Sequence, residues 1–267
     1  VYAEKEVQDY DKVIAYADKV MNTTGVELED SYETLWGYDE TAKDCMKRNT
    51  KEGILEVHWT TGSGNWETWM YGRQLDNWDY YFTWAKWITP SRDIINDFDK
   101  EGDEVRKNQA IVYYACTWSN YYPASNYPFM YKLRSSYNNI YWVRLADIIL
   151  MKAEAEAYKG NLAESAKLVN QIRKRAKLKE LTSDKTGSKE SMIEAVLHER
   201  RLELAFEGER WFDLCRNNKV EKYLNGIDNR DSGRIRQVKQ FDSNSYLLPI
   251  PQTALDQNTN LEQNPGY

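Results

Sequence analysis

The sequence is poor in the residues that bind metals or form disulfides. It has three cysteines among 267 residues, and they stand far apart without a Cys-x-x-Cys pair: Cys45, Cys116 and Cys215. This spacing suggests neither a zinc site nor a disulfide framework. His198-Glu199 begins like a zincin motif, but Leu202 stands where the second histidine would have to be. The only other histidine, His58, has no Ser or Cys nucleophile at a suggestive spacing.

Motifs that bind nucleotides or calcium are also missing. Gly62-x-Gly64 would need a third glycine at Glu67 for a dinucleotide fingerprint, and no Walker-type sequence occurs. Residues 228–233 resemble a calcium loop, but Arg230 occupies a ligand position, which favours a plain turn. We therefore predict no cofactor and no metal site.

Neither a basic block nor a long apolar run is present. The 36 basic and 42 acidic residues give a net charge of −6, so nucleic acid and anionic membrane surfaces are poor candidate partners. The longest apolar run, residues 145–151, is interrupted by Asp147 and is far shorter than the roughly 20 residues of a spanning helix. Val1 is followed by charged, helix-like sequence without a signal peptide or a lipid-attachment Cys, which is typical of a processed or cut N-terminus.

Tryptophan and tyrosine, in contrast, are abundant: 10 Trp and 20 Tyr stand against 6 Phe. A buried indole N–H or phenol O–H needs a hydrogen-bond partner, so core packing alone would not favour these residues over Phe. We therefore expect many of these rings to keep one end in water. Five rings are better interpreted as core residues: Trp59, Phe82, Trp87, Trp142 and Trp211.

The rings are concentrated in residues 60–87, a glycine-punctuated stretch without helical or strand periodicity. Nine rings stand in the 22 positions from Trp66 to Trp87. A long loop in a compact domain is usually functional, and flat rings beside polar side chains suit the apolar face and hydroxyl rim of a sugar. The alternative for any single ring is that it anchors the loop to the helices. The predicted ligand-binding residues, including three from a second aromatic stretch, are Trp66, Trp69, Tyr71, Arg73, Asp76, Asn77, Trp78, Tyr80, Tyr81, Trp84, Trp118, Tyr121 and Tyr122.

The rest of the chain predicts a mainly all-α fold. Apolar periodicity indicates helices at 10–21, 141–158, 162–176 and 191–206, and another at 209–217 after Gly208. Two short helices around Gly37 are expected in 31–47, a strand at 53–59, and a helix capped by Thr89 with Pro90 at its first position. Because the turn at Gly160-Asn161 is tight, the helices beside it must pack antiparallel, as in tetratricopeptide-type pairs. The Pro-containing segment 247–251 should lie extended across the helices.

Several motifs in this order resemble one known family. Residues 141–155 read YWVRLADIILMKAEA and resemble the Arg-x-Ala-Asp-x-x-Leu-x-x-Ala-Glu-Ala signature of the SusD/RagB family of surface glycan-binding lipoproteins. Further matches are Gly102-Asp103 with Arg106, which resembles the family's Gly-Asp-x-Arg element, the NQIR sequence at 170–173, the charged run 199–214, LPIP at 248–251 and QNPGY at 263–267. The match is most specific over the last half of the chain.

The resemblance implies the C-terminal portion of a single SusD-like domain, with a tetratricopeptide-like scaffold and long aromatic-rich loops. A helical repeat part at 1–59, a loop-rich ligand-binding part at 60–139 and a C-terminal helical signature part at 140–267 are expected. It also implies a lipoprotein on the outer-membrane surface, held by an N-terminal lipid anchor outside this chain. Such a protein binds oligosaccharides and delivers them to a SusC-like, TonB-dependent barrel transporter for nutrient uptake, without catalysis and without a cofactor.

Two alternatives remain open from the residues: an all-α glycoside hydrolase or lyase, and a peptide receptor on the same scaffold. Glu199 and Glu203 lie on one helical face, Asp213 comes near in sequence, and paired carboxylates can supply an acid and a base. However, Arg200, Arg201 and Arg210 stand among them, and close arginines lower carboxylate pKa values, which is the wrong direction for a general acid. We therefore predict structural ion pairs here, with Arg210 in one of them.

Overall fold

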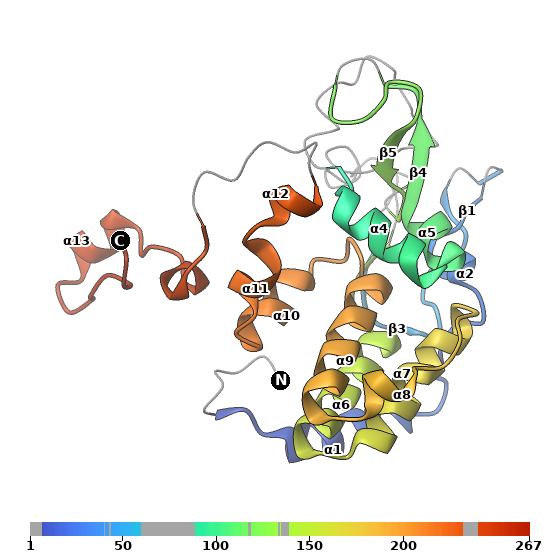
Figure 1. Cartoon of the computed structure of the whole chain (residues 1–267), viewed down its shortest axis with the longest axis horizontal. Coiled ribbons are helices and arrows are strands. Elements are labelled where there is room, and N and C mark those ends of the chain that lie inside the picture. Colours follow the sequence, from blue (N-terminus) through green and yellow to red (C-terminus); the bar gives the residue numbers. More distant parts are fainter. Residues whose placement is uncertain are drawn as a thin grey trace.

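The structure, a computed structural model, describes residues 7–39, 41–42, 44–59, 89–116, 119–132, 134, 139–231 and 240–267. In these residues the predicted, mainly helical class is confirmed, and three short two-stranded sheets accompany the helices. Figure 1 shows most helices gathered in one body, with the C-terminal segment to one side.

The centre of the fold is a helical layer. α6 (Leu145–Lys159) and α7 (Leu162–Arg175) run antiparallel, because Gly160 ends α6 in a left-handed conformation (φ 86°) that returns the chain at once. α9 (Lys189–Glu203) packs on both, after the short α8 (Ser183–Thr186), and α1 (Tyr10–Met21) covers α6 from the other side. The buried core includes Ile149, Leu150, Val169, Ile172, Met192, Val196 and Leu197.

The chain enters α6 from a strand, which corrects the predicted helix start at residue 141. β6 (Ile140–Arg144) pairs antiparallel with β3 (Gly53–Val57), and Glu56 stands opposite Tyr141. The β-branched and aromatic residues of β6 favour a strand once a partner is present, and that partner lies far away in sequence. The strand predicted at 53–59 is confirmed.

Two further predictions were wrong: the second short helix in 31–47, and Thr89 as the cap of the helix that follows Pro90. α2 (Tyr32–Trp36) is the only helix in 31–39, and β1 (Tyr38–Asp39) with β2 (Asp44–Cys45) forms an antiparallel pair where a second short helix was predicted. α4 (Arg92–Glu101) begins after Ser91, whose Oγ accepts from the Ile94 N–H at 3.3 Å. Ser91, not Thr89, is therefore the cap, because Pro90 precedes the helix.

α5 (Glu104–Ala110) follows α4 and leads into β4 (Ile111–Tyr114), which pairs with β5 (Tyr127–Met130) in an antiparallel ladder. Asp103 caps α5 by accepting from the Arg106 N–H at 3.1 Å. This unit rests on the end of α9 through Phe98, Ile111 and Leu202. It forms the top of the molecule in Figure 1.

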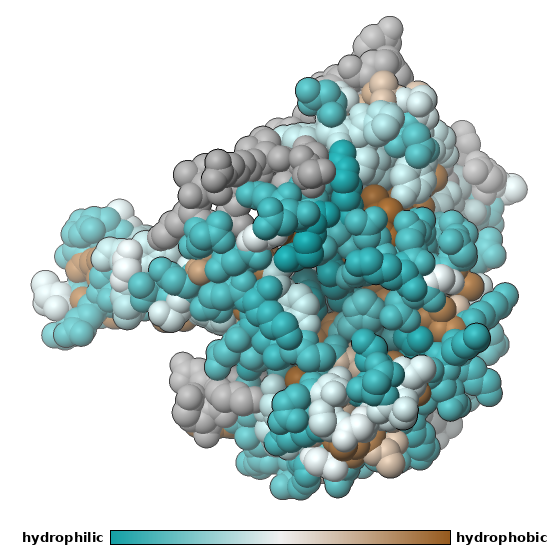
Figure 2. All heavy atoms as spheres, in the orientation of Figure 1, coloured by the Kyte–Doolittle hydropathy of each residue, from teal (hydrophilic) through white to brown (hydrophobic). Residues whose placement is uncertain are grey.

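The C-terminal part is a series of short helices: α10 (Arg210–Arg216), α11 (Val220–Leu224), α12 (Ile227–Arg230), the 3-10 helix η3 (Ser243–Tyr246) and α13 (Gln252–Gln257). Residues 247–251 are extended as predicted, but they do not cross the helices, since Leu248 is 83% exposed. Asn264 Nδ2 donates to the Leu248 carbonyl at 2.6 Å, so the tail folds on itself. Figure 1 shows α13 projecting away from the helical layer, and Figure 2 shows a mostly hydrophilic surface on the same face.

Candidate functional site

Most of the predicted ligand-binding residues lie outside the described residues. Those in 60–88 and Trp118 belong to this group, so their role stays a prediction: Trp66, Trp69, Tyr71, Arg73, Asp76, Asn77, Trp78, Tyr80, Tyr81, Trp84 and Trp118. The structure does describe the residues that flank the ring-rich segment, residues 60–87. Trp59 stands two residues after the end of β3, and Thr89 stands three residues before the start of α4.

The two predicted rings that are described, Tyr121 and Tyr122, lie beside the end of that segment. The Tyr122 hydroxyl donates to the Pro90 carbonyl at 2.5 Å, and the Arg92 guanidinium lies 4.1 Å from the Tyr122 ring centre. Arg92 also donates to the Tyr121 carbonyl. Burial raises the pKa of Tyr122, and Asp231 raises it further. Arg92 therefore covers one face of the Tyr122 ring. Hydrogen bonds hold Tyr121 and Tyr122 against the start of α4.

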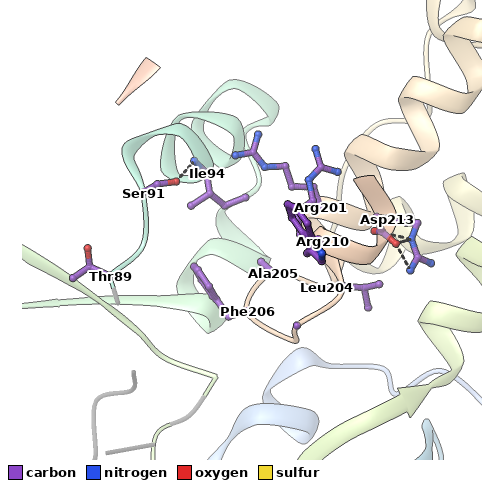
Figure 3. A pocket seen from close by; sticks show the side chains of 12 residues that line it. Thr89, Ser91, Ile94, Arg201, Leu204, Ala205, Phe206, Arg210 and Asp213 are labelled. Atoms are coloured by element: carbon purple, nitrogen blue, oxygen red, sulfur yellow. Dashed lines mark hydrogen bonds and ion pairs between the residues drawn. The ribbon is translucent and has the colours of Figure 1, made fainter. Parts of the chain in front are cut away.

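A pocket of about 330 Å³ opens between the start of α4 and the junction of α9 with α10. This volume is at the lower end of the range for small-ligand sites. Figure 3 shows Thr89 and Ser91 on one side, Phe206 and Ala205 on another, and Arg201 with Arg210 on a third. The lining residues are Thr89, Ser91, Ile94, Arg200, Arg201, Leu204, Ala205, Phe206, Gly208, Arg210, Trp211 and Asp213.

None of these twelve residues was among the predicted ligand-binding residues. Trp211, predicted as core, is 36% exposed and lines the pocket, and Trp142, also predicted as core, is 66% exposed on β6. Both are exposed because a helix of seven residues and a two-stranded sheet each leave one face open to solvent. The only sequence signal for the pocket was Gly208, whose φ of 91° breaks the chain between α9 and α10.

The three arginines of the pocket differ in their partners. Arg200 pairs with Asp147 at 2.7 Å and with Asp213 at 3.0 Å. Arg201 pairs with two aspartates of α4, with Asp93 at 2.7 Å and with Asp97.

Arg210 has no such partner. It donates to the Leu197 carbonyl at 3.1 Å and lies 4.7 Å from the Tyr223 ring centre, without an ion pair in the described part of the chain. The prediction that Arg210 belongs to a buried ion pair was therefore wrong, because Asp213 forms its ion pairs with Arg200 and Arg216.

The carboxylates that suggested catalysis are buried in a separate cluster. Glu199 is 0% exposed and accepts from Arg106 at 2.7 Å and Arg173 at 3.0 Å. Glu203 is 1% exposed, and Arg144 at 2.7 Å and Arg175 at 2.6 Å both donate to its Oε1.

Burial alone would raise the pKa of Glu203, but Arg175, Arg144 and Arg106 outweigh burial and hold this pKa well below its ordinary value. The structural ion-pair interpretation is confirmed by these distances. Neither Glu199 nor Glu203 is accessible to a substrate, and the lowered pKa of Glu203 keeps that carboxylate ionised at neutral pH. These two glutamates therefore do not supply the acid and base of the hydrolase mechanism that was considered for them.

No group of three or more His, Cys, Asp or Glu side chains in the described residues could hold a metal ion. None of their helices combines the length and apolar character that crossing a bilayer requires.

Comparisons with known proteins identify relatives. The model of the SusD family matches residues 51–267. The SusD-like protein P38 of Formosa agariphila is 36% identical over 135 residues, which are 48% of this chain and 25% of that protein. The matched part therefore spans about a quarter of that relative.

Solved structures agree on the fold. A SusD superfamily protein from Bacteroides vulgatus superposes with a TM-score of 0.71 at 23% identity, over 97% of this chain and 59% of that one. Surface glycan-binding protein A of Bacteroides thetaiotaomicron, solved in complex with laminarihexaose, superposes with a TM-score of 0.67 at 18% identity, over 96% of this chain and 59% of that one. At these identities the likeness establishes the fold.

Proposed function

This chain belongs to the SusD family, and from that premise we propose that it binds oligosaccharides through the rings of the ring-rich segment. The observation that carries the proposal is the family match over residues 51–267 together with nine rings in 22 positions. Aromatic faces stack on the C–H face of a sugar, while Arg73, Asp76 and Asn77 of the same segment can bond its hydroxyls. A relative of the same fold was solved with laminarihexaose bound, which supports a glycan ligand.

The proposal includes the location and the partner of the protein. We infer a lipid-anchored protein on the outer-membrane surface that passes its ligand to a SusC-like, TonB-dependent transporter. Family membership supports this inference. Co-purification of the full-length protein with a barrel transporter from outer membranes is the test, and a full-length protein found only in the periplasm would contradict it.

We propose a binding protein and not an enzyme. In the described residues, Glu199 and Glu203 are held by arginines and are closed to solvent. A glycosidase needs two carboxyl groups that flank the scissile bond, one of them with a raised pKa. Release of reducing sugar by the pure full-length protein would contradict this proposal.

Calorimetric titration against a panel of oligosaccharides tests the binding site. We expect Trp69→Ala and Trp78→Ala each to weaken binding about tenfold, which corresponds to about 1.4 kcal/mol. Trp142→Ala is the matched control, because Trp142 is an exposed tryptophan on β6, outside the ring-rich segment. Its affinity should equal that of the wild type. A full-length protein that binds no glycan of the panel, but binds peptides, would replace the proposal with the peptide-receptor alternative.

A further inference from the structure

The pocket between α4 and the α9–α10 junction contains one cation whose charge is not matched by a carboxylate. Arg200 and Arg201 each pair with two aspartates. Arg210 has a single hydrogen bond, from Nη1 to the Leu197 carbonyl, and its other nitrogens have no hydrogen-bond partner in the described residues. Arg210 lines the pocket and is only partly buried.

The surroundings leave the Arg210 charge poorly compensated. Burial lowers the pKa of Arg210, and repulsion from Arg201 lowers it further, to about 10. Asp213 and Asp97 offset only part of this effect. The side chain is still protonated at neutral pH, so a fixed positive charge with free N–H donors stands at the wall of the pocket.

Another part of the lining is apolar, and one of its residues has an uncommon backbone conformation. Phe206 adopts a φ of 66°, in the left-handed region that bulky residues rarely occupy. Figure 3 shows its ring in the space between Thr89 and Ala205. Leu204 and Trp211 complete an apolar surface beside Arg210. One guanidinium next to apolar side chains suits a ligand with one anionic group and one apolar face.

We propose that this pocket binds a carboxylate-bearing sugar residue, a hexuronate of an acidic glycan, with its carboxylate on Arg210. The planar guanidinium forms paired hydrogen bonds with a planar carboxylate, and the pyranose C–H face covers Phe206 and Trp211. This inference rests on the proposed function, because it adds a charge-selective subsite to a glycan-binding surface. A neutral sugar would leave the Arg210 donors without a partner.

The pocket includes the residue at which the described chain resumes after the ring-rich segment. This residue, Thr89, lines the pocket, and the Tyr122 hydroxyl donates to the carbonyl of the next residue, Pro90. The ring-rich segment is therefore joined to the pocket wall through one or two residues of backbone. The net charge of −6 opposes an acidic ligand at long range, but at physiological salt charges beyond about 8 Å are largely screened.

The test compares acidic oligosaccharides with their own neutral forms by calorimetric titration of the full-length protein. Hexamers of galacturonate, glucuronate and mannuronate are each titrated beside their methyl esters, which keep the ring and remove the charge. We expect at least one acid form to bind about tenfold more tightly than its ester. Arg210→Gln should remove that preference and leave the affinity for the ester unchanged.

A second pair of variants tests the pocket independently, in case Arg210→Gln does not fold. Thr89→Glu places a negative charge at the pocket and should weaken binding of the acid form only. Thr253→Glu adds the same charge on the exposed α13, away from the pocket, and should have no effect. Loss of acid binding in both variants would show a general charge effect and would overturn the inference.

The remaining outcomes separate this inference from the proposed function. Equal affinity for acid and ester, with both weakened by Trp78→Ala, overturns the subsite and leaves glycan binding standing. Absence of binding to every glycan, acidic or neutral, overturns both. A hexaglutamate peptide that binds as tightly as the uronates and depends equally on Arg210 would overturn the assignment to a sugar.

Discussion

Replacing Glu203 by Gln removes one negative charge from the centre of the buried ion-pair cluster without changing its shape. In the described residues its buried side chains are five cations and five carboxylates, and Arg173 also pairs with the partly exposed Glu101 at its edge. The substitution therefore removes one negative charge from a place where water does not reach. The buried side chains of the cluster are Arg106, Lys132, Arg144, Arg173, Arg175, Glu52, Asp103, Glu199, Glu203 and Glu207.

The size of the effect follows from the contacts. Oε1 of Glu203 accepts from Arg144 and Arg175, and Oε2 accepts from the Tyr32 hydroxyl at 2.6 Å and from Arg106 at 3.2 Å. In a glutamine one of the two oxygens is replaced by an NH₂ group, which cannot accept a hydrogen bond. The two donors on that side therefore lose their acceptor, and each lost hydrogen bond to a charged group costs about 1.5 to 3 kcal/mol. Breaking a buried ion pair costs about 3 to 5 kcal/mol. We therefore expect a loss of about 4 kcal/mol in the free energy of unfolding.

Urea denaturation at pH 7 measures this loss, and a thermal melt should show a decrease of about 8 °C, at about 2 °C per kcal/mol for a domain of this size. In the folded protein the pKa of Glu203 lies well below its ordinary value of 4.5. The ionised Glu203 therefore stabilises the fold above pH 4.5, and this contribution is lost progressively as the pH falls below 4.5 toward the folded-state pKa. Glu203→Gln has no such proton to bind. The difference between wild type and variant should therefore shrink by about 1.4 kcal/mol per pH unit below pH 4.5.

Glu164→Gln is the matched control for this prediction. Glu164 pairs with Lys167 at 3.2 Å, with 38% of the Glu164 side chain and 76% of the Lys167 side chain exposed. Such surface pairs contribute about 0.2 to 1 kcal/mol. Equal losses for Glu203→Gln and Glu164→Gln would refute the reasoning, because burial would then make no difference. A loss for Glu203→Gln that stays constant from pH 5 to pH 3.5 would refute the pKa argument separately.

Two further predictions concern single positions. Gly160→Ala should cost about 1 to 2 kcal/mol in urea denaturation, because a Cβ would meet no atom within 4 Å and only the left-handed backbone opposes it; an unchanged midpoint would contradict this. Arg210→Met should cost less than about 2 kcal/mol, since it removes one hydrogen bond to Leu197 and a ring contact with Tyr223. A loss as large as that of Glu203→Gln would mean that Arg210 has a charged partner after all.

The helices that carry a continuous apolar face could be predicted from the sequence alone. α1 spans Tyr10–Met21 as predicted, and α6 and α7 meet at Gly160 because that glycine can adopt a positive φ. These signals are local: a helix bonds residues four apart, so its pattern is complete within a few turns. The family signature at 141–155 also depends only on residues close together in the chain.

Contacts between residues far apart in the sequence could be seen only in the folded structure. β6 became a strand because β3 lies beside it, and Arg106 reaches Glu203 across a separation of 97 residues. The pocket between α4 and the α9–α10 junction also forms only in the folded chain. Arg210 lacks an ion pair there because the nearby aspartates pair with Arg200 and Arg201. The sequence shows how many arginines and carboxylates there are. Their pairing is set by packing, because the energy of each pair depends on distance and burial.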